Sequence, residues 1–125
     1  MKKLIPHIEF PGNCLEAINH YVHVFKGEIE ALDKYKDQPV SVPKDWENKI
    51  YFCHFKFEGG EFYASDKESA STSSFWVQCE SEAEILEIAK KLFDRKEISI
   101  TKSVFGESMF RERDSFGIEW NLILR

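Results

Sequence analysis

The fold is decided by residues 50–66, IYFCHFKFEGGEFYASD, because two strand patterns meet there at a turn. Alternating side chains of unlike polarity are typical of a half-buried strand. In Ile50–Phe57 one face carries the more apolar set, and the other face carries Phe52, His54 and Lys56. Gly59-Gly60 is typical of a hairpin turn, and Phe62–Asp66 is the returning strand. The stretch therefore predicts an antiparallel β-hairpin.

Two strands and a helix are predicted upstream of this hairpin. Residues 3–10 alternate as a strand, which lies at an edge or pairs only after Pro6, because proline cannot donate to the ladder. Asn13 is a good N-cap and Gly27 a good stop for an amphipathic helix between them. Residues 29–35 form the next strand, and the polar segment 37–48 is a long loop. The order is therefore strand, helix and three strands.

The same order recurs after the polar segment 67–72. Phe75–Cys79 alternates as a strand, and Ser81–Glu84 is a capping box that opens a second helix. Three more strands are expected at Ile98–Ile100, Met109–Arg113 and Ile118–Leu124. The sequence thus predicts an α+β fold made of two tandem βαβββ modules. They form one domain, 1–125, with module one at 1–66, a linker at 67–72 and module two at 73–125.

Composition narrows the classes of partner. The chain has 125 residues and a net charge of -5, without a Lys/Arg cluster, so we expect no nucleic-acid or membrane partner. No apolar run approaches the roughly 20 residues that span a bilayer. Cys14, Cys53 and Cys79 each lie in an apolar stretch, which indicates buried reduced thiols. Together with the absence of a signal-peptide pattern, this predicts a cytoplasmic protein.

Each helix is expected to cover the more apolar face of its sheet, which leaves a second face of mixed polarity. Alternation gives the expected members of that face as Ile5, His7, Glu9, Ser74, Trp76, Gln78, Glu119, Asn121 and Ile123. Matching Gly60 to Gly117 adds Phe62, Ala64 and Asp66. Apolar bulk with a few polar groups suits a pocket for a small molecule. The alternative is a sheet face open to solvent.

The predicted ligand-binding residues are Phe62, Trp76, Gln78, Arg111, Glu119 and Asn121. Trp76 could stack on a flat ligand or belong to a dimer interface. Either Arg111 or Arg113 could bind a ligand carboxylate through two hydrogen bonds, or both could remain in solvent. Phe105-Gly106-Glu107 is expected as a loop at the mouth of the pocket.

Three residues are weak catalytic candidates. His7 and Glu9 lie two apart on one strand, so both point to the same side and could act as a base with its orienting group. They could equally form an ion pair without chemistry. His54 could bond a ligand or only satisfy a backbone carbonyl. Whether the protein is an enzyme stays open.

Several segments resemble one family in order along the chain. Residues 10–17 (FPGNCLEA), Ala64-Ser65-Asp66 and residues 114–120 (DSFGIEW) resemble PhnB-like proteins. These belong to the glyoxalase/bleomycin resistance/dioxygenase (vicinal oxygen chelate) superfamily. The resemblance implies two βαβββ modules that are related by pseudo-twofold symmetry, form a half-open barrel and usually assemble as a homodimer. Some PhnB-like chains carry a demethylubiquinone methyltransferase label, and we discount that activity because no glycine-rich cofactor loop is present.

The resemblance also bears on metals. Members with known chemistry hold a divalent metal through His, Gln or Glu on the first and last strands of each module. Those positions fall near Ile5, Ala64, Ser74 and Asn121, which are poor ligands or none. We therefore expect no metal cofactor, although His7 and His54 with Glu9 would be a possible set.

Three functions remain open at this point. The first is metal-free binding of a small, partly aromatic or cationic organic molecule in an acidic cup between the modules. The second is a divalent-metal-dependent lyase, isomerase or dioxygenase. The third is a protein whose sheet face serves only as a dimer surface.

Overall fold

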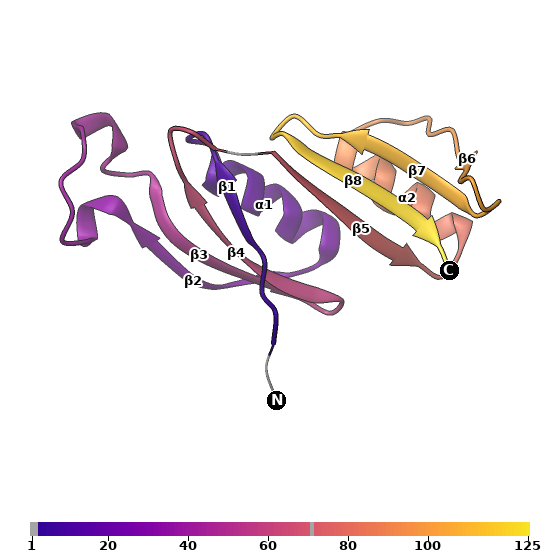
Figure 1. Ribbon diagram of the computed structural model, residues 1–125, viewed down its shortest axis with the longest axis horizontal. Coiled ribbons are helices and arrows are strands. Elements are labelled where there is room, and N and C mark those ends of the chain that lie inside the picture. The colour runs from indigo at the N-terminus through magenta and orange to yellow at the C-terminus, as the bar shows by residue number, and fades with distance from the viewer. Residues whose placement is uncertain (1–2, 71) are drawn as a thin grey trace. The chain divides into compact units, whose positions relative to one another are not determined.

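The computed structural model describes residues 3–70 and 72–125 (Figure 1). The chain divides into two compact units, residues 1–71 (unit 1) and 72–125 (unit 2). Each unit contains one α-helix and one four-stranded mixed sheet. The α+β class is therefore confirmed.

Unit 1 has the predicted order of elements. Its sheet runs β1-β4-β3-β2, with β1 parallel to β4 and the other pairs antiparallel. Pairing of the edge strand β1 begins just after Pro6, as expected. The long loop holds two short 3-10 helices, η1 (Tyr35–Asp37) and η2 (Lys44–Trp46). The other elements are β1 (His7–Phe10), α1 (Cys14–Phe25), β2 (Glu28–Lys34), β3 (Ile50–Phe57) and β4 (Gly60–Asp66).

Unit 2 repeats this arrangement with the sheet order β5-β8-β7-β6. Its elements are β5 (Ser73–Cys79), α2 (Glu82–Phe93), β6 (Thr101–Lys102), β7 (Ser108–Arg113) and β8 (Ile118–Leu124). β5 is parallel to β8, as β1 is to β4. The predicted duplication is confirmed. The predicted strand at 98–100 is wrong, because Ile98 and Ile100 pack against the core under α2 and only the next two residues pair with β7.

Each helix covers the apolar face of its own sheet. In unit 1, Ile8, Cys53 and Phe55 are fully buried on the α1 side. In unit 2, the core under α2 is built from Cys79, Ile85, Ala89, Phe110 and Leu122. We call the opposite side of each sheet its open face. Burying these side chains supplies the main stabilisation of each unit, at about 25 cal/mol per Å² of apolar surface.

The expected members of the open face are corrected for β4. Ala64 pairs with Ile8 and with Cys53, so it belongs to the buried side. Phe62 and Asp66 share that side and are 5% and 1% exposed. The prediction failed because β4 corresponds to β8 with a shift of one residue, so that Gly60 matches Ile118 and not Gly117. A shift of one residue in a strand turns every side chain to the other face.

The helix starts differ between the units. The capping box of α2 is present: Ser81 Oγ accepts from Glu84 N at 3.1 Å, and Glu84 Oε1 accepts from Glu80 N at 3.1 Å. Asn13 precedes α1, but its side chain makes no capping bond. Asp66 Oδ1 accepts from Cys14 N at 2.9 Å and takes over that role.

Gly27 follows α1 as predicted. A glycine is needed there because the backbone lies very close to β3. The left-handed residue at the end of the helix is Lys26, with φ 55°. A Cβ on Gly27 would lie 2.7 Å from the Lys56 carbonyl oxygen and 2.7 Å from the Phe55 ring. Any side chain there would therefore force the helix away from the sheet.

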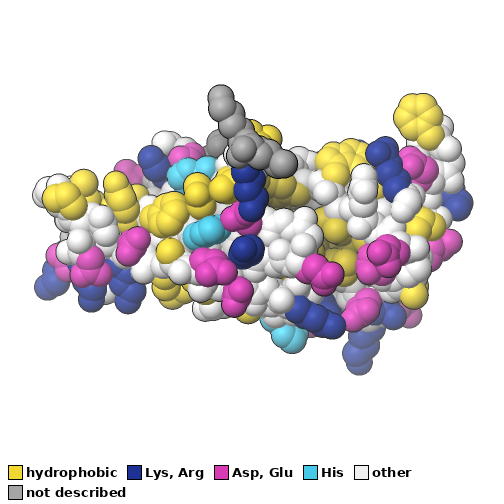
Figure 2. Space-filling model, turned by 90° about the horizontal axis from the view of Figure 1, so that it is seen from below, with side chains coloured by type: hydrophobic (Ala, Val, Ile, Leu, Met, Phe, Trp, Pro, Cys, Tyr) yellow, Lys and Arg dark blue, Asp and Glu magenta, His cyan; other side chains and the backbone are white. Residues whose placement is uncertain are grey.

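The surface carries charges of both signs. On the face shown in Figure 2, Lys and Arg side chains are scattered among Asp and Glu side chains and form no single basic patch. Neither α1 nor α2, the two α-helices of the described chain, is long and apolar enough to cross a membrane.

The three cysteines are free and buried, as predicted. Burial raises the pKa of the Cys53 thiol from 9.0 to about 11. Burial, with a smaller effect of the neighbouring Glu84, raises the pKa of Cys79 to about 11. The pKa of Cys14 is also raised, first by burial and then by the nearby Asp66 carboxylate. All three groups are therefore held as neutral thiols.

We expect the folded protein to resist thiol modification. A pKa of about 11 in place of 9.0 lowers the thiolate fraction near pH 8 about a hundredfold, and the thiolate is the reactive form. Reaction with dithiobis-nitrobenzoate should therefore be at least about a hundredfold slower in the native protein than in guanidinium chloride, where all three thiols should react. A native thiol that reacts at the rate of a free cysteine would contradict this assignment.

Candidate functional site

The open face of unit 2 brings three of the predicted residues into one row. Asn121 on β8 lies opposite Trp76 on β5 and opposite Arg111 on β7. The pairing of three neighbouring strands therefore places an indole, an amide and a guanidinium side by side. The Arg111 guanidinium carbon lies 5.6 Å from the centroid of the Trp76 ring, a distance typical of cation–π contacts.

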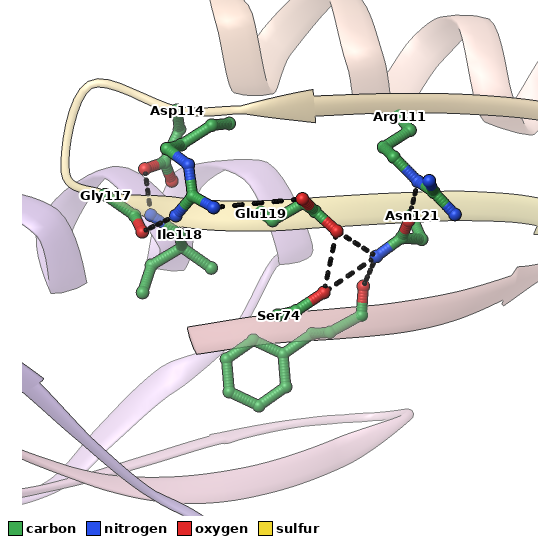
Figure 3. A network of polar contacts seen from close by, with 9 residues as sticks. Ser74, Arg111, Asp114, Gly117, Ile118, Glu119 and Asn121 are labelled. Atoms are coloured by element: carbon green, nitrogen blue, oxygen red, sulfur yellow. Dashed lines mark hydrogen bonds and ion pairs between the residues drawn. The ribbon is translucent and has the colours of Figure 1, made fainter. Parts of the chain in front are cut away.

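Asn121 holds this row together (Figure 3). It is fully buried, and its Oδ1 accepts from Arg111 Nε at 2.5 Å. Its Nδ2 donates to Ser74 Oγ at 3.0 Å and to the Phe75 carbonyl oxygen at 3.1 Å. The amide is thus committed to internal hydrogen bonds, and it fixes the Nε end of Arg111.

Glu119 lies in the next row of the same face, and its charge is compensated locally. Its Oε1 accepts from Ser74 Oγ at 3.0 Å, and its Oε2 lies 3.8 Å from an Arg113 nitrogen (Figure 3). Gln78 lies opposite Ile123 on the other side of the Trp76 row. Both residues share the open face with Trp76, as the sequence predicts.

A pocket of about 510 Å³ lies on this face. The strands contribute Trp76, Met109, Arg111 and Ile123, and the loop between β6 and β7 contributes Phe105. Of the predicted ligand-binding residues, Trp76 and Arg111 line the pocket, whereas Gln78, Glu119 and Asn121 lie beside it. Trp76 is 56% exposed, which leaves much of its ring facing solvent.

The loop at the pocket is held in a defined turn. Ser103 Oγ accepts from Phe105 N at 3.2 Å and from Glu107 N at 3.1 Å. Gly106 has φ +85°, a conformation that favours glycine. Phe105 is thereby presented at the tip with 86% of its surface exposed. The loop lines the pocket of unit 2, while its predicted place at the mouth of a cup between the modules stays a prediction.

Two basic residues of the pocket were missed from the sequence. Lys102 lies on β6, and its Nζ donates to Ser108 Oγ at 2.9 Å. Arg125 follows β8, and its Nε donates to Glu107 Oε2 at 3.0 Å. The charged residues of the pocket wall are Lys102, Arg111, Arg125 and Glu107. The wall of this pocket therefore has more basic than acidic side chains, and the acidic cup expected between the modules stays a prediction.

The open face of unit 1 carries a different row, His7, Tyr63 and His54. His7 Nε2 is 2.9 Å from Ser65 Oγ, and His54 Nε2 is 2.5 Å from Glu61 Oε2. The His54 ring lies edge-on to the Tyr63 ring with centroids 5.1 Å apart. Both histidines are therefore engaged by neighbours on β4.

His7 and Glu9 contact different neighbours. Glu9 lies 3.9 Å from Lys67 Nζ, while the hydrogen-bond partner of His7 is Ser65. Within residues 3–70 and 72–125, no three His, Cys, Asp or Glu side chains are grouped so that they could hold a metal ion. The structure thus does not assemble His7, Glu9 and His54 into one site.

Residues 2–123 match the model of the family described as 3-demethylubiquinone-9 3-methyltransferase. A search of proteins with curated functions gives no match.

Solved structures share the fold over the whole chain. The Pseudomonas aeruginosa protein PA1353 is 24% identical, with a TM-score of 0.82 over 100% of this chain and 98% of that one. The Bacillus cereus PhnB protein is 25% identical, with a TM-score of 0.78 over 99% and 100%. A bleomycin-binding protein complexed with bleomycin is 8% identical, with a TM-score of 0.61 over 100% and 99%. The chain therefore belongs to the family described as 3-demethylubiquinone-9 3-methyltransferase, and it shares the fold of the PhnB protein and of the bleomycin-binding protein.

Proposed function

We propose that the protein binds a small, partly aromatic organic molecule in the pocket of unit 2 and does so without a metal ion. The observation that carries this proposal is the exposed Trp76 ring, which lies beside Arg111 in a pocket of about 510 Å³. Pockets for small organic molecules have volumes of about 300–1,000 Å³. The size and the lining of this pocket both suit such a ligand.

Trp76 supplies the main binding surface. A tryptophan buries about 150–250 Å² when it is covered, and stacked rings gain about 0.5–1.5 kcal/mol beyond that burial. In the free protein, 56% of Trp76 faces solvent, so a flat ligand can recover much of this surface. Met109 and Ile123 extend the apolar floor beside the ring.

The chemistry of the available donors supports binding without a metal. At the positions where metal-dependent members of the superfamily carry ligands, unit 2 has Ser74 and Asn121. A hydroxyl and an amide are weak ligands for transition metals, which prefer imidazole, carboxylate or thiolate. Moreover, the Asn121 amide is already bonded to Arg111, Ser74 and the backbone of Phe75. These residues do not fit a metal centre.

A protein of the same fold is consistent with this function. The bleomycin-binding protein is complexed with bleomycin, so the fold holds an organic molecule in that protein. At 8% identity the likeness concerns the fold alone. The ligand of the present protein is therefore argued from its own pocket.

A thermal-shift screen over a metabolite library tests the proposal. A ligand at a hundred times its Kd should stabilise the wild type by about 2.7 kcal/mol. The shift should disappear in Trp76→Ala and persist in Trp46→Phe, which alters a tryptophan outside the pocket. Trp76→Ala also removes the contact between the indole and Arg111, so the melting temperature of each free variant is the reference for its own ligand-induced shift.

Two results would contradict the proposal. One is a set of ligands whose shifts survive Trp76→Ala. The other is a stoichiometric divalent metal in freshly purified protein whose removal abolishes ligand binding, which would favour a metal-dependent lyase, isomerase or dioxygenase.

A further inference from the structure

We infer that the molecule bound in this pocket is an anion, whose carboxylate, sulfonate or phosphate group is held by Arg111. This inference rests on the proposed function and specifies the chemical class of the ligand. It starts from the charges of the pocket wall.

The pocket wall carries uncompensated positive charge. Glu107 accepts from Arg125 Nε at 3.0 Å, so these two charges offset one another. Arg111 remains on the open face, and within the described part of the chain it has no carboxylate at ion-pair distance. The whole chain has 22 acidic and 17 basic residues. The unpaired charge of Arg111 is therefore opposite in sign to the net charge of the chain, and it attracts an anion.

Arg111 is oriented to bind such a group. Its Nε donates to Asn121 Oδ1 at 2.5 Å, and this bond leaves its two terminal amino groups available (Figure 3). Asn121 is itself fixed by Ser74 and by the Phe75 carbonyl oxygen, so the guanidinium is held at one end. A planar guanidinium that is held in this way is pre-organised to bond two oxygens of a carboxylate, sulfonate or phosphate.

Lys102 also borders the pocket, but its side chain lies on the other face of the sheet. Lys102 pairs with Ser108 on β7, and its Nζ donates to Ser108 Oγ at 2.9 Å. Successive side chains of β7 point to opposite faces, so Lys102 and Ser108 lie on the face opposite to Met109 and Arg111. Arg111 is therefore the cation that meets the ligand on the open face.

The remaining wall defines the rest of the molecule. Trp76, Phe105, Met109 and Ile123 are large and apolar. A ligand that matches this wall has an apolar or aromatic body in addition to its anionic group. The apolar part and the anionic group of the ligand are therefore the two features to vary in an experiment.

Two fluorescent dyes that differ only in the charged group provide the test. Anilinonaphthalenesulfonate carries a sulfonate, and phenylnaphthylamine has the same rings without it. We expect the sulfonate dye to bind the wild type at least tenfold more tightly. Arg111→Gln should weaken its binding about threefold to tenfold and leave the binding of phenylnaphthylamine unchanged. Lys90→Gln removes the same charge from the exposed side of α2 and should affect neither dye.

The outcomes separate this inference from the proposed function. Equal affinities for the two dyes, or sulfonate binding that is unaffected by Arg111→Gln, would overturn the anionic class while the dyes still depended on Trp76. If Trp76→Ala changes the binding of neither dye, or if neither binds, both the anionic class and the proposed function fall.

Discussion

Asp66→Ala is expected to lower the free energy of unfolding by about 3–5 kcal/mol, because each hydrogen bond to a charged group contributes about 1.5–3 kcal/mol. Asp66 is 1% exposed. Its Oδ1 accepts from Cys14 N at 2.9 Å and its Oδ2 accepts from Ile50 N at 2.8 Å. One carboxylate thus connects the end of β4 to the first turn of α1 and to the start of β3, and alanine leaves two buried N–H groups without a partner.

Urea unfolding followed by circular dichroism measures this loss. Asp66→Asn should cost less than Asp66→Ala, because the amide oxygen can still accept one of the two bonds. Asp45→Ala, at an exposed aspartate of η2, serves as the control and should stay within about 0.5 kcal/mol of the wild type. Equal stabilities of Asp66→Ala and Asp45→Ala would show that the carboxylate does not hold these elements together.

A similar loss, about 3–5 kcal/mol, is expected for Asp114→Ala in unit 2. Asp114 Oδ1 accepts from Phe116 N and from Ile118 N, both at 2.9 Å. Its Oδ2 accepts from Trp120 Nε1 at 2.8 Å. The side chain is 8% exposed. Its removal therefore leaves the β7–β8 turn and the indole N–H of a buried tryptophan without their acceptor.

Tryptophan fluorescence reports this change directly. The emission of Trp120 should shift to the red in Asp114→Ala as water reaches the indole, and the urea midpoint should fall. Glu97→Ala removes an exposed carboxylate from the same unit and should change neither quantity. An unchanged emission and midpoint in Asp114→Ala would refute the structural role assigned to this carboxylate.

The sequence predicted the strands whose side chains alternate over their whole length. β3 and β8 begin and end at the predicted residues, Ile50–Phe57 and Ile118–Leu124. β6 was misplaced because it has only two residues, too few for a pattern. The neighbouring Ile98 and Ile100 alternate because they fill the core under α2. Alternating apolar residues can therefore mark a segment that packs against a core without strand pairing, as well as a strand.

The candidate site was predicted in part. Trp76 and Arg111 were found because both lie on long strands whose faces can be deduced from alternation. Lys102 and Arg125 were missed, since their place at the pocket depends on the path of the β6–β7 loop and on the residue that follows β8. Phe62 was assigned to the wrong face by one residue of register. The homodimer and the cytoplasmic location stay predictions of the sequence.

The rows Trp76–Asn121–Arg111 and His7–Tyr63–His54 occupy equivalent places on two copies of one scaffold. After a duplication, strand pairing constrains the backbone of each copy but leaves the side chains of its outer row free to diverge. Here one copy presents a cation beside an indole, and the other presents two imidazoles around a phenol. A small molecule that fits the open face of one unit should therefore not fit the open face of the other. Substitutions in the row of one unit could change its binding properties and leave the other unit unchanged.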